Sequence, residues 1–285
     1  MTDHEKRLRF REILDARRGV VAPSVPEPMF ARLVQDCGYQ LMHLAGNGMH
    51  RSLILPDESM VTMTEMAERA ATIARVLDIP LMVDGETGYG GPRHMARAVQ
   101  AFERAGASGI RFEDSVFGAN GIGTMGTAGV QSVAEFVDKI KAAVDARTDQ
   151  SLVLVIRVDS HKVEGLDQMM DRAAAYIAAG ADAINFHVQS REDHEAVGKR
   201  ATYPLLQPWP RGGINNVNDL FATGCTVALM TSNVALAGLA AARTMLLQLR
   251  ESGNVEDYFN AVPDLAPVRH WYEDLGFRPT KPFVG

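Results

Sequence analysis

Eight short apolar runs alternate with helical patterns along this chain, and the alternation restricts the fold more than any single motif does. The apolar residues in these runs are mostly consecutive rather than at every second position, which is typical of a strand buried on both faces. The runs are 19–22, 41–45, 81–84, 109–113, 152–157, 183–187, 205–207 and 227–230. Helical patterns lie near 27–38, 62–78, 93–106, 131–146, 165–180, 192–199, 216–223 and 233–252. Eight such units in 285 residues predict an α/β fold, a (β/α)8 TIM barrel.

Two segments lie outside these units. Residues 4–17 have an amphipathic pattern and predict an extra N-terminal helix. Residues 254–285 are not needed to close a barrel, and they hold helical patterns at 255–261 and 268–275. We expect them to form a C-terminal helical extension that packs on the outside or on a neighbouring subunit. No linker divides the chain, so we predict one domain over 1–285 with 254–285 as its extension.

Composition excludes several classes of function. The net charge is −6, and no basic stripe with interleaved aromatic residues is present, which argues against a nucleic-acid partner. Polar residues interrupt the longest apolar stretch, 227–249, so it predicts a strand and a helix rather than a membrane span. The first 12 residues are charged and lack the apolar core of a secretory signal. With only Cys37 and Cys225, which lack metal-site spacing, we expect a cytoplasmic protein.

Charged residues gather where the predicted strands end. Asp84 and Glu86 follow one strand, and Glu113 with Asp114 follows the next. In a barrel these strand ends build the active site together. Carboxylates on adjacent strand ends repel one another unless a cation lies between them, and a divalent ion with oxygen ligands is the simplest such cation. The remaining strand ends carry 46–48, Arg157, Asn185, His187, Gln207 and 231–233.

Each of these residues also has a plainer interpretation. Asp84 and Glu86 fit a helix-entry turn, where the helix dipole favours carboxylates. Arg157 would be satisfied by Asp159 or Glu113 alone, without a substrate. A single histidine such as His187 is often a core residue. The glycines of 46–48 would permit a tight turn, and Asp57 would fit a turn after proline.

Several separated motifs resemble the isocitrate lyase/phosphoenolpyruvate mutase superfamily. They are VDGETGYGG at 83–91, FED at 112–114 and IRVD at 156–159, together with LPD at 55–57, EGLD at 164–167 and AGADA at 179–183. The resemblance covers about residues 8–250. It implies a (β/α)8 barrel that binds Mg²⁺, with Mn²⁺ as an alternative, and a homotetramer whose paired subunits exchange their last barrel helix. It also implies cleavage or formation of a C–C or P–C bond next to a carboxylate.

The same resemblance implies roles for individual residues. Asp84 would bind the metal directly, whereas Glu86, Glu113 and Asp57 would hold metal-bound waters. Family members usually have Asp at the position of Glu86. Backbone amides of Gly46, Asn47 and Gly48 would hold the substrate carboxylate or an enolate oxygen, although family members often have Ser at 46 or 47. Arg157 would clamp a substrate carboxylate, and His187 matches a histidine of the mutase branch. The remaining candidates for the site are Asp84, Asn120 and Asn233 for substrate binding, and Glu113, Arg157 and His187 for catalysis.

The loop after the fourth strand departs from the family. Lyase members carry a Lys-Lys/Arg-Cys-Gly-His loop there, and its cysteine protonates the departing carbanion. Residues 115–126 of this chain contain no Cys, Lys or His, and Asn120 is the polar candidate that remains from the mutase branch. We therefore expect a reaction that needs only metal, carboxylate clamp and a proton from water, such as decarboxylation of oxaloacetate.

The sequence thus predicts a Mg²⁺-dependent lyase that cleaves a C–C bond in a small 2-oxo or 2-hydroxy di- or tricarboxylic acid. Mg²⁺ chelated by a 2-oxo acid stabilises the negative charge that builds on the carbonyl oxygen as the neighbouring bond breaks. Both oxaloacetate decarboxylase-like and methylisocitrate lyase-like reactions fit this scheme. The alternatives are P–C chemistry of the phosphoenolpyruvate mutase or phosphonopyruvate hydrolase type, and a barrel that binds carboxylates without catalysis.

Overall fold

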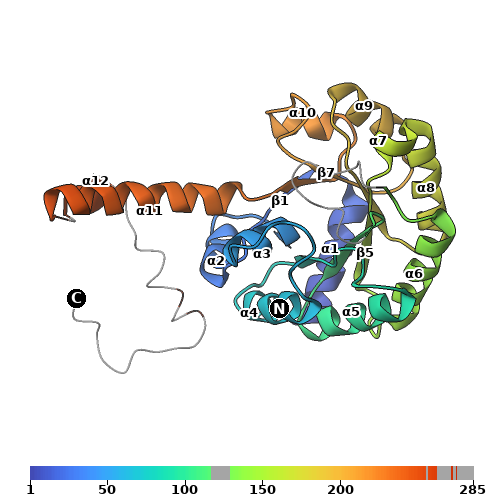
Figure 1. Ribbon diagram of the computed structural model, residues 1–285, viewed down its shortest axis with the longest axis horizontal. Coiled ribbons are helices and arrows are strands. Elements are labelled where there is room, and N and C mark those ends of the chain that lie inside the picture. The colour runs from blue at the N-terminus through green and yellow to red at the C-terminus, as the bar shows by residue number, and fades with distance from the viewer. Residues whose placement is uncertain (117–128, 255, 262–270, 272–273, 275–285) are drawn as a thin grey trace. The chain divides into compact units, whose positions relative to one another are not determined.

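Eight parallel strands form a nearly closed barrel in the computed structural model (Figure 1). The structure describes residues 1–116, 129–254, 256–261, 271 and 274. The strands are β1 (Val20–Pro23), β2 (Met42–Leu44), β3 (Leu81–Asp84), β4 (Gly109–Glu113), β5 (Val153–Val158), β6 (Ala183–Phe186), β7 (Leu205–Pro208) and β8 (Val227–Met230). Each strand pairs with its neighbour in sequence from β2 to β8, and β8 pairs with β1. A parallel bridge between Ser24 and His43 joins the remaining edges, so the predicted barrel is confirmed.

Figure 1 shows α5, α6 and α8 around the strands, and the described part of residues 1–233 holds ten helices of the barrel in all. They are α1 (Asp3–Ala16), α2 (Pro28–Asp36), α3 (Gly46–Ser52), α4 (Met63–Ala74), α5 (Pro92–Arg104), α6 (Val133–Ala146), α7 (His161–Glu164), α8 (Leu166–Ala178), α9 (Arg191–Arg200) and α10 (Val217–Ala222). Capping boxes begin α1, α4 and α6, because a Thr or Ser side chain and a Glu three residues later satisfy free amides there. The short helices α3 and α7 were not predicted.

Helix α1 closes the N-terminal end of the barrel. Phe10, Ile13 and Leu14 pack in one buried cluster with Val153, Val227 and other residues at the starts of strands. Gly109 begins β4, and a Cβ there would collide with the ring of Phe10. The absence of a side chain at 109 therefore lets α1 seal this end, which leaves the opposite end for a site.

Contacts within the chain define two units, Met1–Asn233 and Val234–Gly285. The second unit contains nearly all of α11 (Asn233–Ser252) and α12 (Glu256–Ala261), so it begins before position 254, where we expected an extension to start. Along α11 no residue is buried, and Leu236, Leu239 and Leu246 are exposed. Within the described residues, no helix is both long and apolar enough to cross a membrane. Cys37 and Cys225 are both unpaired.

Candidate active site

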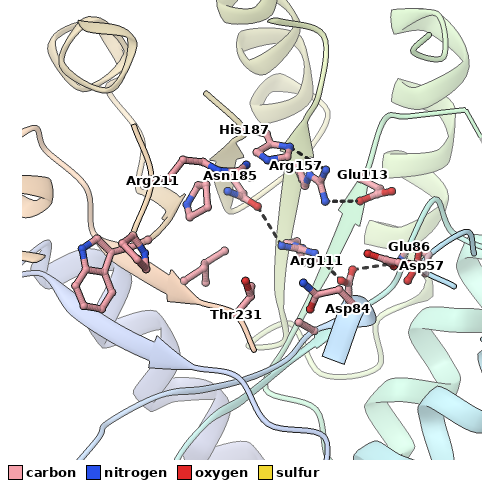
Figure 2. A pocket seen from close by; sticks show the side chains of 16 residues that line it. Asp57, Asp84, Glu86, Arg111, Glu113, Arg157, Asn185, His187, Arg211 and Thr231 are labelled. Atoms are coloured by element: carbon pink, nitrogen blue, oxygen red, sulfur yellow. Dashed lines mark hydrogen bonds and ion pairs between the residues drawn. The ribbon is translucent and has the colours of Figure 1, made fainter. Parts of the chain in front are cut away.

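The C-terminal ends of the strands surround a cavity of about 160 Å³. Its lining combines four carboxylates with three arginines, a histidine and several neutral side chains (Figure 2). The lining residues are Ala45, Asn47, Asp57, Asp84, Glu86, Arg111, Glu113, Arg157, Asn185, His187, Pro208, Trp209, Pro210, Arg211, Leu229 and Thr231. This is the end of a (β/α)8 barrel at which active sites are built.

The carboxylates of Asp84, Glu86, Glu113 and Asp57 come from neighbouring parts of the barrel. Asp84 and Glu113 end β3 and β4, and Glu86 lies two residues beyond Asp84 with a φ of 50°. Burial, reinforced by the charges of Asp84 and Glu113, raises the pKa of Glu86 well above its ordinary value. Burial likewise raises the pKa of Glu113 and of Asp57. Glu86, Glu113 and Asp57 therefore all bind a proton more readily than exposed carboxyl groups do.

Arg111 is the principal site residue that the sequence analysis missed. Its Nη2 lies 2.5 Å from Oδ2 of Asp84, and its Nη1 lies 3.3 Å from Oδ1 of Asn185. Burial acts to raise the pKa of Asp84, but the Arg111 charge and other contacts hold it below its ordinary value, so Asp84 is an anion. Arg111 stands two residues before Glu113 in β4 and so shares its face of the strand. This spacing was a signal that could have identified it.

Arg157 joins three other groups of the site. Its Nη1 lies 2.9 Å from Oε2 of Glu113, and its Nε donates to Oδ1 of Asp159 at 2.8 Å. Its Nη2 lies 3.0 Å from Nδ1 of His187, and the same His187 atom lies 3.1 Å from Oδ1 of Asp159. Arg157 thus makes both of the internal pairs that its plainer interpretation allowed, while it also lines the cavity. Burial and the neighbouring Arg157 lower the pKa of His187 to about 4, so this imidazole is neutral near pH 7.

Asp114 follows Glu113 but faces a different environment. Its Oδ1 accepts a hydrogen bond from the backbone amide of Asp159 at 2.9 Å, and its Oδ2 accepts one from the hydroxyl of Tyr176 at 3.0 Å. Burial is the main cause that raises the pKa of Asp114 to about 7. Asp114 does not line the cavity. It ties the end of β4 to the end of β5 and to α8.

The predicted substrate-binding residues 46–48 lie in a helix, and the amide of one of them already has a partner in the protein. Residues 46–48 form the first turn of α3 rather than a loop. The Gly46 amide donates to Oδ2 of Asp84 at 2.8 Å, so a protein carboxylate already uses this donor. A Cβ at position 46 would overlap Oε1 of Glu86 and would lie 3.1 Å from Oδ2 of Asp84. Gly46 is therefore required by the close approach of these carboxylates.

The other predicted residues differ in their placement. Asn47 lines the cavity, whereas Gly48 faces Ser24 and Pro26. Asn233 is exposed at the start of α11 and is not a lining residue. Asn120 lies outside the described residues. Thr231, one of the strand-end residues 231–233, lines the cavity, and so does Arg211, which the sequence did not single out.

The donor set fits a hard divalent cation. Carboxylate oxygens are the ligands that Mg²⁺ prefers, and four acidic side chains line one wall of the cavity. Among the described residues, no three acidic, histidine or cysteine side chains form a group that could enclose an ion by themselves. A Mg²⁺ ion in this place would keep several water ligands, as is ordinary for this ion. This arrangement matches one direct carboxylate ligand and others that act through water.

Comparison with known proteins places the chain in a family. The sequence model described as phosphoenolpyruvate phosphomutase matches residues 10–250. The 2-methylisocitrate lyase of Aeropyrum pernix is 34% identical, over 94% of this chain and 86% of the relative. The oxaloacetate decarboxylase of Rhodopseudomonas palustris is 34% identical over 80% of each chain.

Solved structures agree with these sequence relatives. The phosphoenolpyruvate phosphomutase of Streptomyces platensis subsp. rosaceus has a TM-score of 0.88 and 25% identity, over 95% of this chain and 96% of its own. A phosphonopyruvate hydrolase in complex with oxalate and Mg²⁺ has a TM-score of 0.85 and 26% identity, over 96% of both chains. With this fold, these strand-end residues and these relatives, the chain belongs to the phosphoenolpyruvate mutase/isocitrate lyase superfamily.

Proposed function

We propose that this chain is a Mg²⁺-dependent lyase that cleaves a C–C bond in a small 2-oxo or 2-hydroxy di- or tricarboxylic acid. One observation carries the proposal: a single cavity has carboxylates on the β3 and β4 side and Arg157, His187 and Arg211 on the β5 to β7 side (Figure 2). A cation and an anionic substrate are complementary to these two sides. Two relatives that are 34% identical to the chain are named as a lyase and a decarboxylase of carboxylic acids.

Each group of the site has a task in such a reaction. When bound, Mg²⁺ acts as a Lewis acid that polarises the substrate beside its carboxylate. Asp84 would offer the anionic ligand, while Glu86, Glu113 and Asp57 would hold the ion through water. Arg111 keeps Asp84 ionised and fixes one of its oxygens. Arg157 offers its guanidinium to the substrate carboxylate, and Glu113 and Asp159 hold that guanidinium in place.

His187 is the candidate proton carrier. The neutral ring has two tautomers, and Nδ1 contacts both Asp159 and Arg157. When Nδ1–H donates to Asp159, Nε2 keeps its lone pair and can accept a proton from a substrate hydroxyl. When Nδ1 instead accepts from Arg157, Nε2 carries the hydrogen and can donate it. Cleavage of a 2-hydroxy acid needs the first tautomer, whereas decarboxylation of a 2-oxo acid needs neither.

P–C chemistry is the second candidate. It is supported by the similarity to structures of a phosphoenolpyruvate phosphomutase and a phosphonopyruvate hydrolase. Against it stands the sequence of 115–126, which contains no lysine that could bind a phosphoryl group. A third candidate, a barrel that binds carboxylates without turnover, follows from the absence of a cysteine in the same segment. We consider both candidates less well supported than C–C cleavage.

A substrate screen tests the proposal. The purified protein is incubated with oxaloacetate, 2-methylisocitrate, isocitrate, 2,3-dimethylmalate or phosphonopyruvate, with Mg²⁺ or with EDTA. Release of pyruvate and of phosphate is followed separately, together with glyoxylate, succinate and propionate. We expect Mg²⁺-dependent cleavage of a carboxylic acid without phosphate, and loss of activity in Asp84→Ala. Phosphate release would instead support P–C chemistry, and binding without turnover of any compound would support the silent barrel.

We also propose that the chain forms a homo-oligomer, with a tetramer as the expectation. The support is α11, which exposes Leu236, Leu239 and Leu246 and buries no residue in the part of the chain that the structure describes. Light scattering coupled to gel filtration measures the mass directly, and a monomer at micromolar concentration would contradict the proposal. A cytoplasmic location stays a prediction from the sequence.

A further inference from the structure

The three arginines that line the cavity differ in how their charges are balanced. Arg111 is paired with Asp84, and Arg157 is paired with Glu113 and Asp159. Among the described residues, no ion pair or side-chain hydrogen bond is formed by the guanidinium of Arg211. Arg211 is half-buried. A half-buried cation without a partner is poorly solvated, so the pairing of Arg211 with an anion that enters the cavity would be favourable.

The protein core holds the backbone on both sides of Arg211. The amide of Trp209 donates to the Leu229 carbonyl at 2.9 Å, and the amide of Ile214 donates to the Arg211 carbonyl at 3.0 Å. Gly212 and Gly213, at φ 61° and 74°, make the turn between Arg211 and Ile214. Trp209 and Ile214 pack in one apolar cluster with Leu220, Cys225 and Ala228. The segment is therefore anchored at both ends, and its cation is presented at a fixed place.

The side chain of Arg211 extends toward His187 (Figure 2). Burial and the nearby charge of Arg157 lower the pKa of Arg211, and Asp159 offsets this only in part. The carboxylates Asp84, Glu86 and Asp57 belong to the opposite side of the cavity, near β2 and β3. A ligand whose head group is held by the metal site and Arg157 would thus place its far end at Arg211.

We propose that Arg211 binds a second carboxylate of the substrate, distal to the 2-oxo or 2-hydroxy acid head. The substrate is then a dicarboxylic or tricarboxylic acid rather than a monocarboxylic acid such as pyruvate or lactate. This inference rests on the proposed function, because that function assigns the head group to the metal site and Arg157. A guanidinium recognises a carboxylate by two parallel N–H···O bonds, which a half-buried position strengthens.

Binding measurements at saturating Mg²⁺ test the inference without turnover. The ligands are oxalate, which presents only the head, and malate and lactate, which differ by the distal carboxylate. In the wild type, malate should bind more tightly than lactate. In Arg211→Gln the affinity for malate should fall about 10- to 100-fold, while the affinities for oxalate and lactate stay within about twofold. Arg211→Lys should recover part of the malate affinity, because it restores the charge without the planar geometry.

The control and the contrary outcomes separate the two proposals. Arg191→Gln removes an exposed arginine paired with Asp219, and it should leave all three affinities unchanged. If oxalate binds and malate loses nothing in Arg211→Gln, the distal subsite is wrong while the proposed function stands. If no ligand binds the wild type in a Mg²⁺-dependent manner, the proposed function fails and the subsite fails with it. Tighter binding of 3-phosphonolactate than of malate, with the same dependence on Arg211, would overturn the assignment of a carboxylate.

Discussion

Replacement of Gly46 by alanine should damage the candidate metal site with little effect on the fold. The added methyl group would overlap Oε1 of Glu86 and approach Oδ2 of Asp84 to 3.1 Å. The Glu86 carboxylate must therefore move, because it is the flexible end of its side chain. If Glu86 serves the metal through water, its displacement should raise the Mg²⁺ concentration for half-maximal activity about 10- to 100-fold.

The effect of Gly46→Ala on the free energy of unfolding can be compared with that of Gly48→Ala, a replacement of the neighbouring glycine. Gly48 lies in the same turn of α3, and a Cβ there meets nothing closer than 3.8 Å. Gly48→Ala should stabilise the protein by about 0.5–1 kcal/mol, or about 1–4 °C in melting temperature, because alanine restricts the unfolded chain. Gly46→Ala should be stabilised by a similar amount through its helix propensity, but its methyl group must displace the Glu86 side chain. We expect its net change in unfolding free energy to stay within about 1 kcal/mol.

Mg²⁺ titration of activity, combined with thermal unfolding, measures both quantities. The second variant, Glu86→Asp, withdraws the carboxylate by one methylene and makes room for the alanine. In Gly46→Ala/Glu86→Asp the Mg²⁺ requirement should therefore rise by less than the product of the two single effects. A wild-type Mg²⁺ requirement in Gly46→Ala would refute a metal role for Glu86. An equal rise in Gly48→Ala would show that α3, rather than the carboxylate, is responsible.

Three further perturbations test other groups. Burial lowers the pKa of His43 from 6.5 in the unfolded chain to about 3 in the folded protein. The contribution of neutral His43 to the free energy of unfolding is therefore fully present above pH 6.5 and decreases as the pH falls toward 3. Between pH 7 and pH 5, urea unfolding should show that the wild type loses about 2 kcal/mol more stability than His43→Leu does. Nε2 of His50 accepts hydrogen bonds from the backbone amides of residues 60 and 61 at 3.0 and 3.1 Å. His50→Ala should therefore lower the free energy of unfolding by about 2–3 kcal/mol, measured by the same method, and loosen the segment that bears Asp57. An unchanged unfolding curve would contradict this expectation. Arg157→Lys keeps the charge but not the fork of donors, and kcat/KM should fall about 100-fold with an unchanged circular dichroism spectrum; full activity would remove the proposed clamp.

The barrel could be predicted because most strands are largely apolar runs that alternate with helical patterns along the chain. The short helices α3 and α7 were not predicted because α7 has only four residues and the start of α3 is rich in glycine. The first turn of α3 contains Gly46 and Gly48, and glycine disfavours helix. Its support comes from distant contacts, such as the bond of the Gly46 amide to Asp84. Such contacts join residues far apart in the sequence and leave no local pattern.

The site was predictable to the extent that its residues end strands. Asp84, Glu86, Glu113, Arg157 and His187 all follow or end apolar runs, and the structure places all five around one cavity. Arg111 lies inside a strand and Arg211 lies in a connection after β7, so a search of strand ends does not find either residue. A charged residue inside a buried strand needs a partner, and that rule would have identified Arg111.

The adjacent acids Glu113 and Asp114 divide between two environments. Glu113 contacts Arg157 in the cavity, whereas Asp114 is bonded to Tyr176 of α8 behind it. Because successive side chains of a strand point to opposite faces, the insertion or deletion of one residue in β4 would exchange the two. The shorter carboxylate would then face Arg157, and the longer one would meet the tyrosine hydroxyl. The segment 109–114 should therefore tolerate conservative replacement of its apolar residues, Ile110 and Phe112, better than any change of its length.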